Sequence, residues 1–84
     1  MPVYMDKSKQ TIQQLYGVIL RKNRVAAGLS QEQLALLSGL DRTYISLLER
    51  GLRNPTLNTL FMLGQHLNVP ASKQIKELED RINS

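Results

Sequence analysis

Residues 30–49 read SQEQLALLSGLDRTYISLLE, in which two short apolar segments are separated by Gly39-Leu40-Asp41. Ser30 is followed three residues later by Gln33, which is the spacing of a capping box at a helix start. Asp41 is a favourable N-cap, and glycine commonly follows the last turn of a helix. The pattern therefore predicts one helix that ends at Gly39 and a second that runs from Asp41 to Gly51.

On both sides of this segment, apolar residues recur at three- and four-residue spacing, which is typical of amphipathic helices. We expect a helix over residues 10–27, one that begins at Thr56 after a polar loop, and a last one opened by Pro70. The second helix is expected to bury Leu34, Ala35 and Leu37. The stripe expected to be buried on the fourth consists of Leu57, Leu60, Phe61, Leu63 and Leu67. The prediction is an all-α fold of five helices.

Composition narrows the classes of function. A chain of 84 residues builds one small core, and 42% hydrophobic with 21% charged residues is typical of an ordered globular chain. There is no Cys and a single His, and neither a phosphate-binding glycine loop nor a pair of carboxylates at helical spacing in an apolar setting occurs, so we predict no metal site, no cofactor, no small-molecule ligand and no enzyme. The net charge of +4 favours an anionic partner.

The two central helices have the arrangement of a helix-turn-helix unit, whose second helix presents its first residues to base edges in the DNA major groove. We call this second helix the recognition helix. Its side chains suit that task, since arginine pairs with guanine and hydroxyl side chains serve several bases. The expected base contacts are Arg42, Thr43, Tyr44 and Ser46. For Tyr44 an alternative is packing of the ring on a neighbouring helix with the hydroxyl left in water.

Phosphate groups need hydrogen-bond donors on both sides of the recognition helix. Gln31 offers its amide together with the N–H groups at a helix start, and Arg53 and Asn54 lie on the opposite flank. The segment from Arg21 to Arg53 also carries +3 of the net charge of +4. These features predict that the partner is double-stranded DNA.

The residues resemble a known family in four blocks of ordered spacing: LSQEQLA at 29–35, GLDRTYIS at 39–46, ERG at 49–51 and NPTL at 54–57. They are similar to the lambda-repressor and Cro class, also called the XRE family, over about Ile19 to Val69. Within it, the chain looks most like the controller proteins of restriction-modification systems. The resemblance implies a compact five-helix fold and a transcription regulator that acts as a homodimer on a two-fold symmetric operator.

The resemblance also implies roles for residues outside the recognition helix. Arg24 and Glu49 are expected to form a partly buried salt bridge, the alternative being that Arg24 binds phosphate directly. Dimerisation is expected through the last helix, over residues 69–84, with Ile75, Leu78 and Ile82 at the interface. The alternative for this apolar stripe is that it covers the fourth helix within the same chain.

Two further expectations concern organisation and location. Residues 1–9 are predicted to be a flexible arm, and residues 10–84 the DNA-binding domain; Lys7 and Lys9 suit either a reach to DNA or an extension that stabilises a dimer. No membrane-spanning or signal segment is apparent, so we expect a cytoplasmic protein without membrane contact. The competing function is an antitoxin, or another protein-interaction module, built on the same fold.

Overall fold

The computed structural model describes residues 10–84, which form five α-helices and, within that range, no β-strand. The helices are α1 (Ile12–Ala26), α2 (Gln31–Ser38), α3 (Arg42–Glu49), α4 (Leu57–Leu67) and α5 (Ala71–Ile82). The predicted all-α class and the order of five helices are thus confirmed. The arm predicted at residues 1–9 lies outside the described residues.

Local capping chemistry sets the helix ends. The Ser30 hydroxyl accepts a hydrogen bond from the Gln33 backbone N–H at 3.0 Å, and the Gln33 side chain accepts one from the Ser30 N–H at 2.8 Å, so the predicted capping box is present. Asp41 and Thr56 cap α3 and α4 as predicted. The first helix begins at Ile12 rather than residue 10, because Thr11 forms a second capping box with Gln14.

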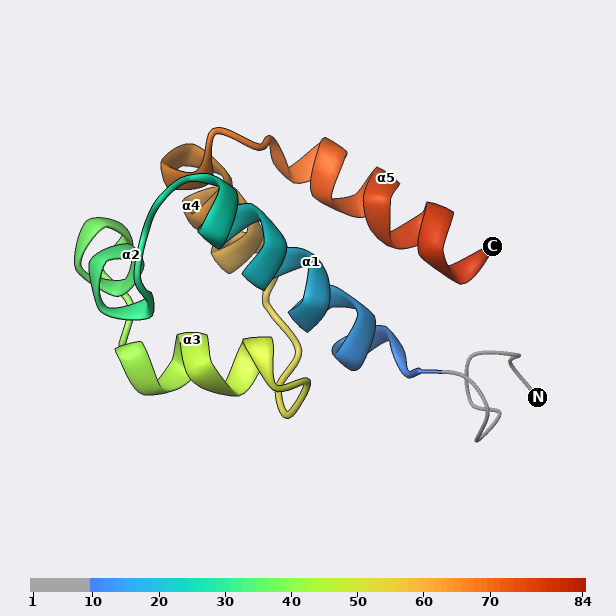
Figure 1. The fold of residues 1–84 in the computed structure, drawn as a ribbon, viewed down its shortest axis with the longest axis horizontal. Coiled ribbons are helices and arrows are strands. Elements are labelled where there is room, and N and C mark those ends of the chain that lie inside the picture. The colour runs from blue at the N-terminus through green and yellow to red at the C-terminus, as the bar shows by residue number, and fades with distance from the viewer. Residues whose placement is uncertain (1–9) are drawn as a thin grey trace.

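Helix α1 lies between α3 and α5 and packs against both, while α4 packs against α2 and α5 (Figure 1). The arrangement buries one apolar core to which α1, α2, α3 and α4 contribute. Its buried members are Tyr16, Leu20, Leu34, Ala35, Ile45, Leu48, Leu60, Leu63 and Leu67. Because α1 contacts both α3 and α5, the orientation of these two helices relative to each other depends on α1.

The predicted buried stripe of α4 is wrong at two positions. Leu57 and Phe61 remain 74% and 65% exposed, whereas Thr59 is buried. At 3.6 residues per turn, Leu57 and Phe61 lie one turn apart on a face adjacent to the buried one, and no neighbouring helix covers that face within residues 10–84. On α2, Leu37 is likewise 52% exposed, and Ser38 takes its place in the interior.

A glycine allows α1 and the end of α3 to approach closely. A Cβ atom at Gly17 would lie 2.5 Å from the backbone oxygens of both Leu48 and Glu49. No side chain fits in that space, so the backbone of α3 rests directly on α1. This contact holds the C-terminal end of α3 against the body of the protein.

Candidate nucleic-acid interface

The connection between α2 and α3 is a tight turn. Gly39 ends α2 in the left-handed conformation at φ 71°, and its backbone N–H donates to the Ala35 carbonyl. Asp41, two residues after Gly39, is the N-cap of α3, because its side chain accepts a hydrogen bond from the Thr43 N–H at 3.0 Å. The two helices contact each other directly, so the unit has the helix-turn-helix arrangement.

Helix α3 has one apolar side and one open side. Ile45 and Leu48 are completely buried, whereas Arg42 and Thr43 in the first turn are exposed and Ser46 in the second is half-exposed. The structure therefore brings three of the four predicted base-contact residues to the accessible part of α3. An exposed first turn is the geometry by which a recognition helix reaches base edges.

Tyr44 is placed differently from these three residues. Its ring packs against the core, and its hydroxyl lies 3.4 Å from the Thr59 hydroxyl of α4, with Thr56 a further 2.9 Å from Thr59. The residue is half-buried, so only part of its surface remains accessible. The hydroxyl is not simply left in water, as one sequence-based alternative supposed.

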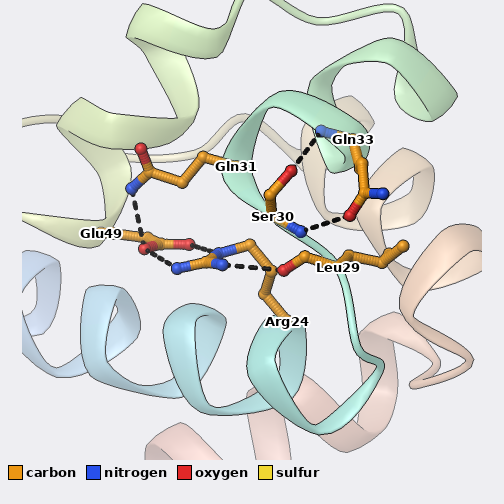
Figure 2. A network of polar contacts seen from close by, with 6 residues as sticks. All are labelled: Arg24, Leu29, Ser30, Gln31, Gln33 and Glu49. Carbon is orange, nitrogen blue, oxygen red and sulfur yellow. Dashed lines mark hydrogen bonds and ion pairs between the residues drawn. The ribbon is translucent and has the colours of Figure 1, made fainter.

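Glu49 at the end of α3 is the centre of a polar network (Figure 2). Its side chain is 4% exposed and accepts hydrogen bonds from Arg24 Nε at 2.6 Å, Arg24 Nη2 at 3.0 Å and Gln31 Nε2 at 3.0 Å. Arg24 Nη1 also donates to the Leu29 carbonyl at 2.8 Å. The network ties α1, α2, α3 and the α1–α2 loop together.

The predicted salt bridge between Arg24 and Glu49 is present and bidentate. The hydrogen bond from Arg24 to Glu49 raises the pKa of the Arg24 guanidinium, against the opposite effect of burial. Gln31, predicted to contact phosphate, stands at the first turn of α2 with one amide N–H committed to Glu49. This contact turns the Gln31 amide toward the last turn of α3.

The remaining predicted phosphate contacts, Arg53 and Asn54, are exposed in the loop between α3 and α4. The Arg53 guanidinium donates to the Leu52 carbonyl at 3.0 Å, which holds it close to the loop. Gly51 at φ 74° starts this loop and lies against Gln14 at the beginning of α1. The predicted phosphate donors therefore lie before and after α3 in the chain, on α2 and on this loop.

Residues 20–74 match the profile of the helix-turn-helix family, and the matched range includes the whole unit formed by α2 and α3. The chain belongs to the XRE helix-turn-helix family. This is a family of DNA-binding transcription regulators, so the resemblance noted in the sequence is confirmed.

Several relatives of this helix-turn-helix protein are controllers. It is 47% identical over 62 residues to the control protein C.SmaI of Serratia marcescens, a match that covers 74% of each chain. The restriction-modification controller protein C.AhdI of Aeromonas hydrophila has a similar structure, with a TM-score of 0.71, 44% identity and 74% and 94% of the two chains covered. The controller C.Esp1396I, solved as a tetramer with its natural 35 base-pair operator, gives a TM-score of 0.77 at 33% identity, with 90% and 100% covered.

Two residues with special packing roles, Gly17 and Gln74, were not predicted from the sequence. Gly17 was not singled out, although a glycine inside a predicted helix indicates either a cost in stability or a close approach. Gln74 was not singled out either, and its contact with Tyr16 was therefore missed. Gln74 occupies the apolar stripe of α5 between Ala71 and Leu78, and a polar residue at such a position was the available signal.

Over residues 10–84, no helix is long and apolar enough to cross a membrane. Nor does this part of the chain bring together three or more His, Cys, Asp or Glu side chains in a group suited to a metal ion.

Proposed function

We propose that the protein is a homodimeric transcription regulator that binds a two-fold symmetric operator, with one α3 in the major groove of each half-site. The observation that carries this proposal is the exposed first turn of α3, with Arg42 and Thr43, on a helix whose other end is anchored by the buried Glu49. The two recognition helices of such a dimer lie about 34 Å apart, one turn of DNA. The proposed function involves no chemical step, and we propose that the protein acts in the cytoplasm, where a regulator of this kind would meet its operator DNA.

The base contacts are assigned to the accessible side of α3. Arg42 is free to donate two hydrogen bonds to a guanine, Thr43 and Ser46 offer hydroxyls, and Tyr44 offers the part of its surface that is accessible. Phosphates are assigned to the flanks, with Gln31 on one side and Arg53 and Asn54 on the other. Arg24, whose guanidinium is committed to Glu49 and the Leu29 carbonyl, has a structural role in this assignment.

Selection from a randomised duplex library at about 0.15 M salt tests the proposal, since specific and non-specific binding separate at such salt concentrations. Enrichment of a two-fold symmetric motif is the expected result. A folded protein that enriches no motif would contradict the proposal and favour a function in binding another protein.

Base and phosphate contacts are expected to respond differently to mutation. Arg42→Ala should weaken operator binding by about 1 to 3 kcal/mol and relax the preference at one base pair, whereas Arg53→Ala should weaken all sequences alike and reduce the salt slope by about one unit. Titrations of both variants against operator and random DNA at several salt concentrations measure this difference. Equal losses on both DNAs for both variants would refute the assignment of roles.

Dimerisation is proposed through α5, with Ile75, Leu78 and Ile82 at the interface. Ile75 is 38% exposed and the other two side chains are partly exposed, so α1 and α4 cover this stripe only in part. One turn before Ile75, Ala71 lines a surface hollow together with the exposed Phe61. The apolar surface thus extends from α5 to α4, and a second copy of the chain would cover it.

Replacing Ile75 by aspartate should weaken the dimer at least about tenfold, because a charge would be buried at the interface. Sedimentation over a concentration series measures the dissociation constant. The matched control is Leu36→Asp, the same kind of exchange at an exposed position of α2, which should leave the dimer unchanged. If the wild-type protein stays monomeric up to about 100 μM, a stable dimer free of DNA is excluded.

We also propose that the regulated genes belong to a restriction-modification system. The similarity to C.SmaI and C.AhdI, both named as controllers, supports this assignment. Neighbouring genes for a methyltransferase and an endonuclease are the expected genomic context. A neighbouring toxin gene would instead indicate an antitoxin.

A further inference from the structure

Gln74 of α5 is a polar side chain in an apolar position. It is 1% exposed, and its amide makes three hydrogen bonds to other parts of the protein. The Oε1 atom accepts from the Tyr16 hydroxyl of α1 at 2.8 Å, and Nε2 donates to the carbonyls of Leu60 and Val69, each at 3.1 Å. One side chain therefore joins α5 to α1, to α4 and to the loop between α4 and α5.

The residues around the Gln74 amide leave space for it and provide its hydrogen-bond partners. A Cβ atom at Gly64 would lie 3.1 Å from Nε2 of Gln74 and 2.7 Å from the Val69 oxygen, so this glycine leaves the space that the amide occupies. Tyr16 is itself only 2% exposed, and burial raises the pKa of its phenol, which therefore stays a hydrogen-bond donor. A leucine at position 74 would fill the volume but would make none of these directional contacts.

A second polar link joins the same two helices one turn further along α5. Glu77 pairs with Lys22 and accepts a hydrogen bond from the Asn23 side chain at 3.3 Å. Burial alone would raise the pKa of Glu77, but the hydrogen bonds from Lys22 and Asn23 outweigh it and lower that pKa. Helix α5 is thus held on α1 at two successive turns, with Gln74 as the buried point.

These contacts connect the proposed dimer surface to the recognition helix. Helix α1 packs against α5 on one side and against α3 on the other. The orientation of α5, which carries Ile75, relative to α3 is therefore set by how α5 packs on α1. In a two-fold dimer, any rotation of α5 on α1 is doubled between the two recognition helices. One added base pair turns a half-site by about 34°, so the operator spacing reports on this angle.

We propose that Gln74 is a positioning residue, which fixes the orientation of α5 on α1 and thereby the half-site spacing that the dimer accepts. The inference rests on the proposed function. Buried polar groups are best established as devices that select one register among several packings of similar energy. At this position the buried Gln74 side chain would select the separation and relative rotation of the two recognition helices.

The test is selection from a library of symmetric half-sites joined by spacers of varied length, performed with the wild-type chain, Gln74→Met and Tyr16→Phe. Methionine keeps the length of glutamine but loses all three contacts, and the tyrosine exchange removes one hydroxyl as a milder variant. Gln13→Met, at a half-exposed position of α1, is the control for the chemical exchange. Circular dichroism establishes that each variant is folded, and binding to a single half-site is measured in parallel.

The wild-type chain and Gln13→Met should prefer one spacing over its one-base-pair neighbours by about tenfold, a free-energy difference of about 1.4 kcal/mol. Gln74→Met should reduce this preference below about threefold, and Tyr16→Phe should reduce it partly, with single half-site binding unchanged. Variants that lose stability or affinity but keep the wild-type spacing would overturn the inference and leave Gln74 a merely structural residue. If the wild-type chain enriches no symmetric motif, the proposed function fails, and the inference falls with it.

Discussion

Replacing Arg24 by alanine should lower the free energy of unfolding by about 3 kcal/mol, because it leaves a buried carboxylate without its charged partner. The side chain of Glu49 is 4% exposed, and two of the three hydrogen bonds that it accepts come from Arg24. Gln31 alone cannot compensate for the lost charge, since its amide is neutral. The Leu29 carbonyl would lose a donor as well.

Thermal unfolding at a fixed protein concentration measures the Arg24 effect, and a loss of this size corresponds to a fall in Tm of about 12 to 24 °C. Lys76→Ala is the control. It removes an ion pair to Asp80 in which both side chains are exposed, so it should cause no measurable change in Tm. A loss below about 0.5 kcal/mol for Arg24→Ala is the size of an ordinary surface exchange and would contradict a structural role.

Replacing Gly17 by valine should destabilise the protein by at least about 3 kcal/mol through overpacking. The first carbon of the new side chain would lie 2.5 Å from two backbone oxygens of α3, at Leu48 and Glu49. Backbone atoms in a helix cannot rotate away as a flexible side chain does, so α3 would have to move off α1. We therefore expect operator binding to fall as well as stability.

Denaturant unfolding and an operator titration of the Gly17→Val variant check both parts of this expectation. The matched control is Ala26→Val, which introduces valine at an exposed position of the same helix and should cost less than about 1 kcal/mol. If Gly17→Val lowered the free energy of unfolding by less than about 1 kcal/mol, like the control, α3 would not rest on α1 as the structure describes.

Features governed by local chemistry were predictable from the sequence. The capping box at Ser30 and the N-caps at Asp41 and Thr56 depend on residues within three positions of each other, so the starts of α2, α3 and α4 followed from spacing alone. The exposed first turn of α3 followed in the same way, since Ile45 and Leu48 had to face inward.

Features that depend on which helices become neighbours were not predictable. Leu57 and Phe61 fit an apolar stripe, but the face on which they lie meets no other helix within residues 10–84. Gln74 and Tyr16 are 58 positions apart, and the spacing of residues along one helix carries no information about such a contact. The pairing of Arg24 with Glu49 was expected only from the family resemblance, for the same reason.

The anchoring of Glu49 separates two tasks along α3. The network of Arg24, Gln31 and Glu49 holds the last turn, while Arg42 and Thr43 stand in solvent at the first turn, outside that network. If Arg42 and Thr43 contact bases as proposed, exchanges at the first turn alter the base preference of α3 at little cost in stability. A helix built in this way allows its operator preference to change by single substitutions while the scaffold stays intact, which makes α3 a suitable element for redesigning specificity.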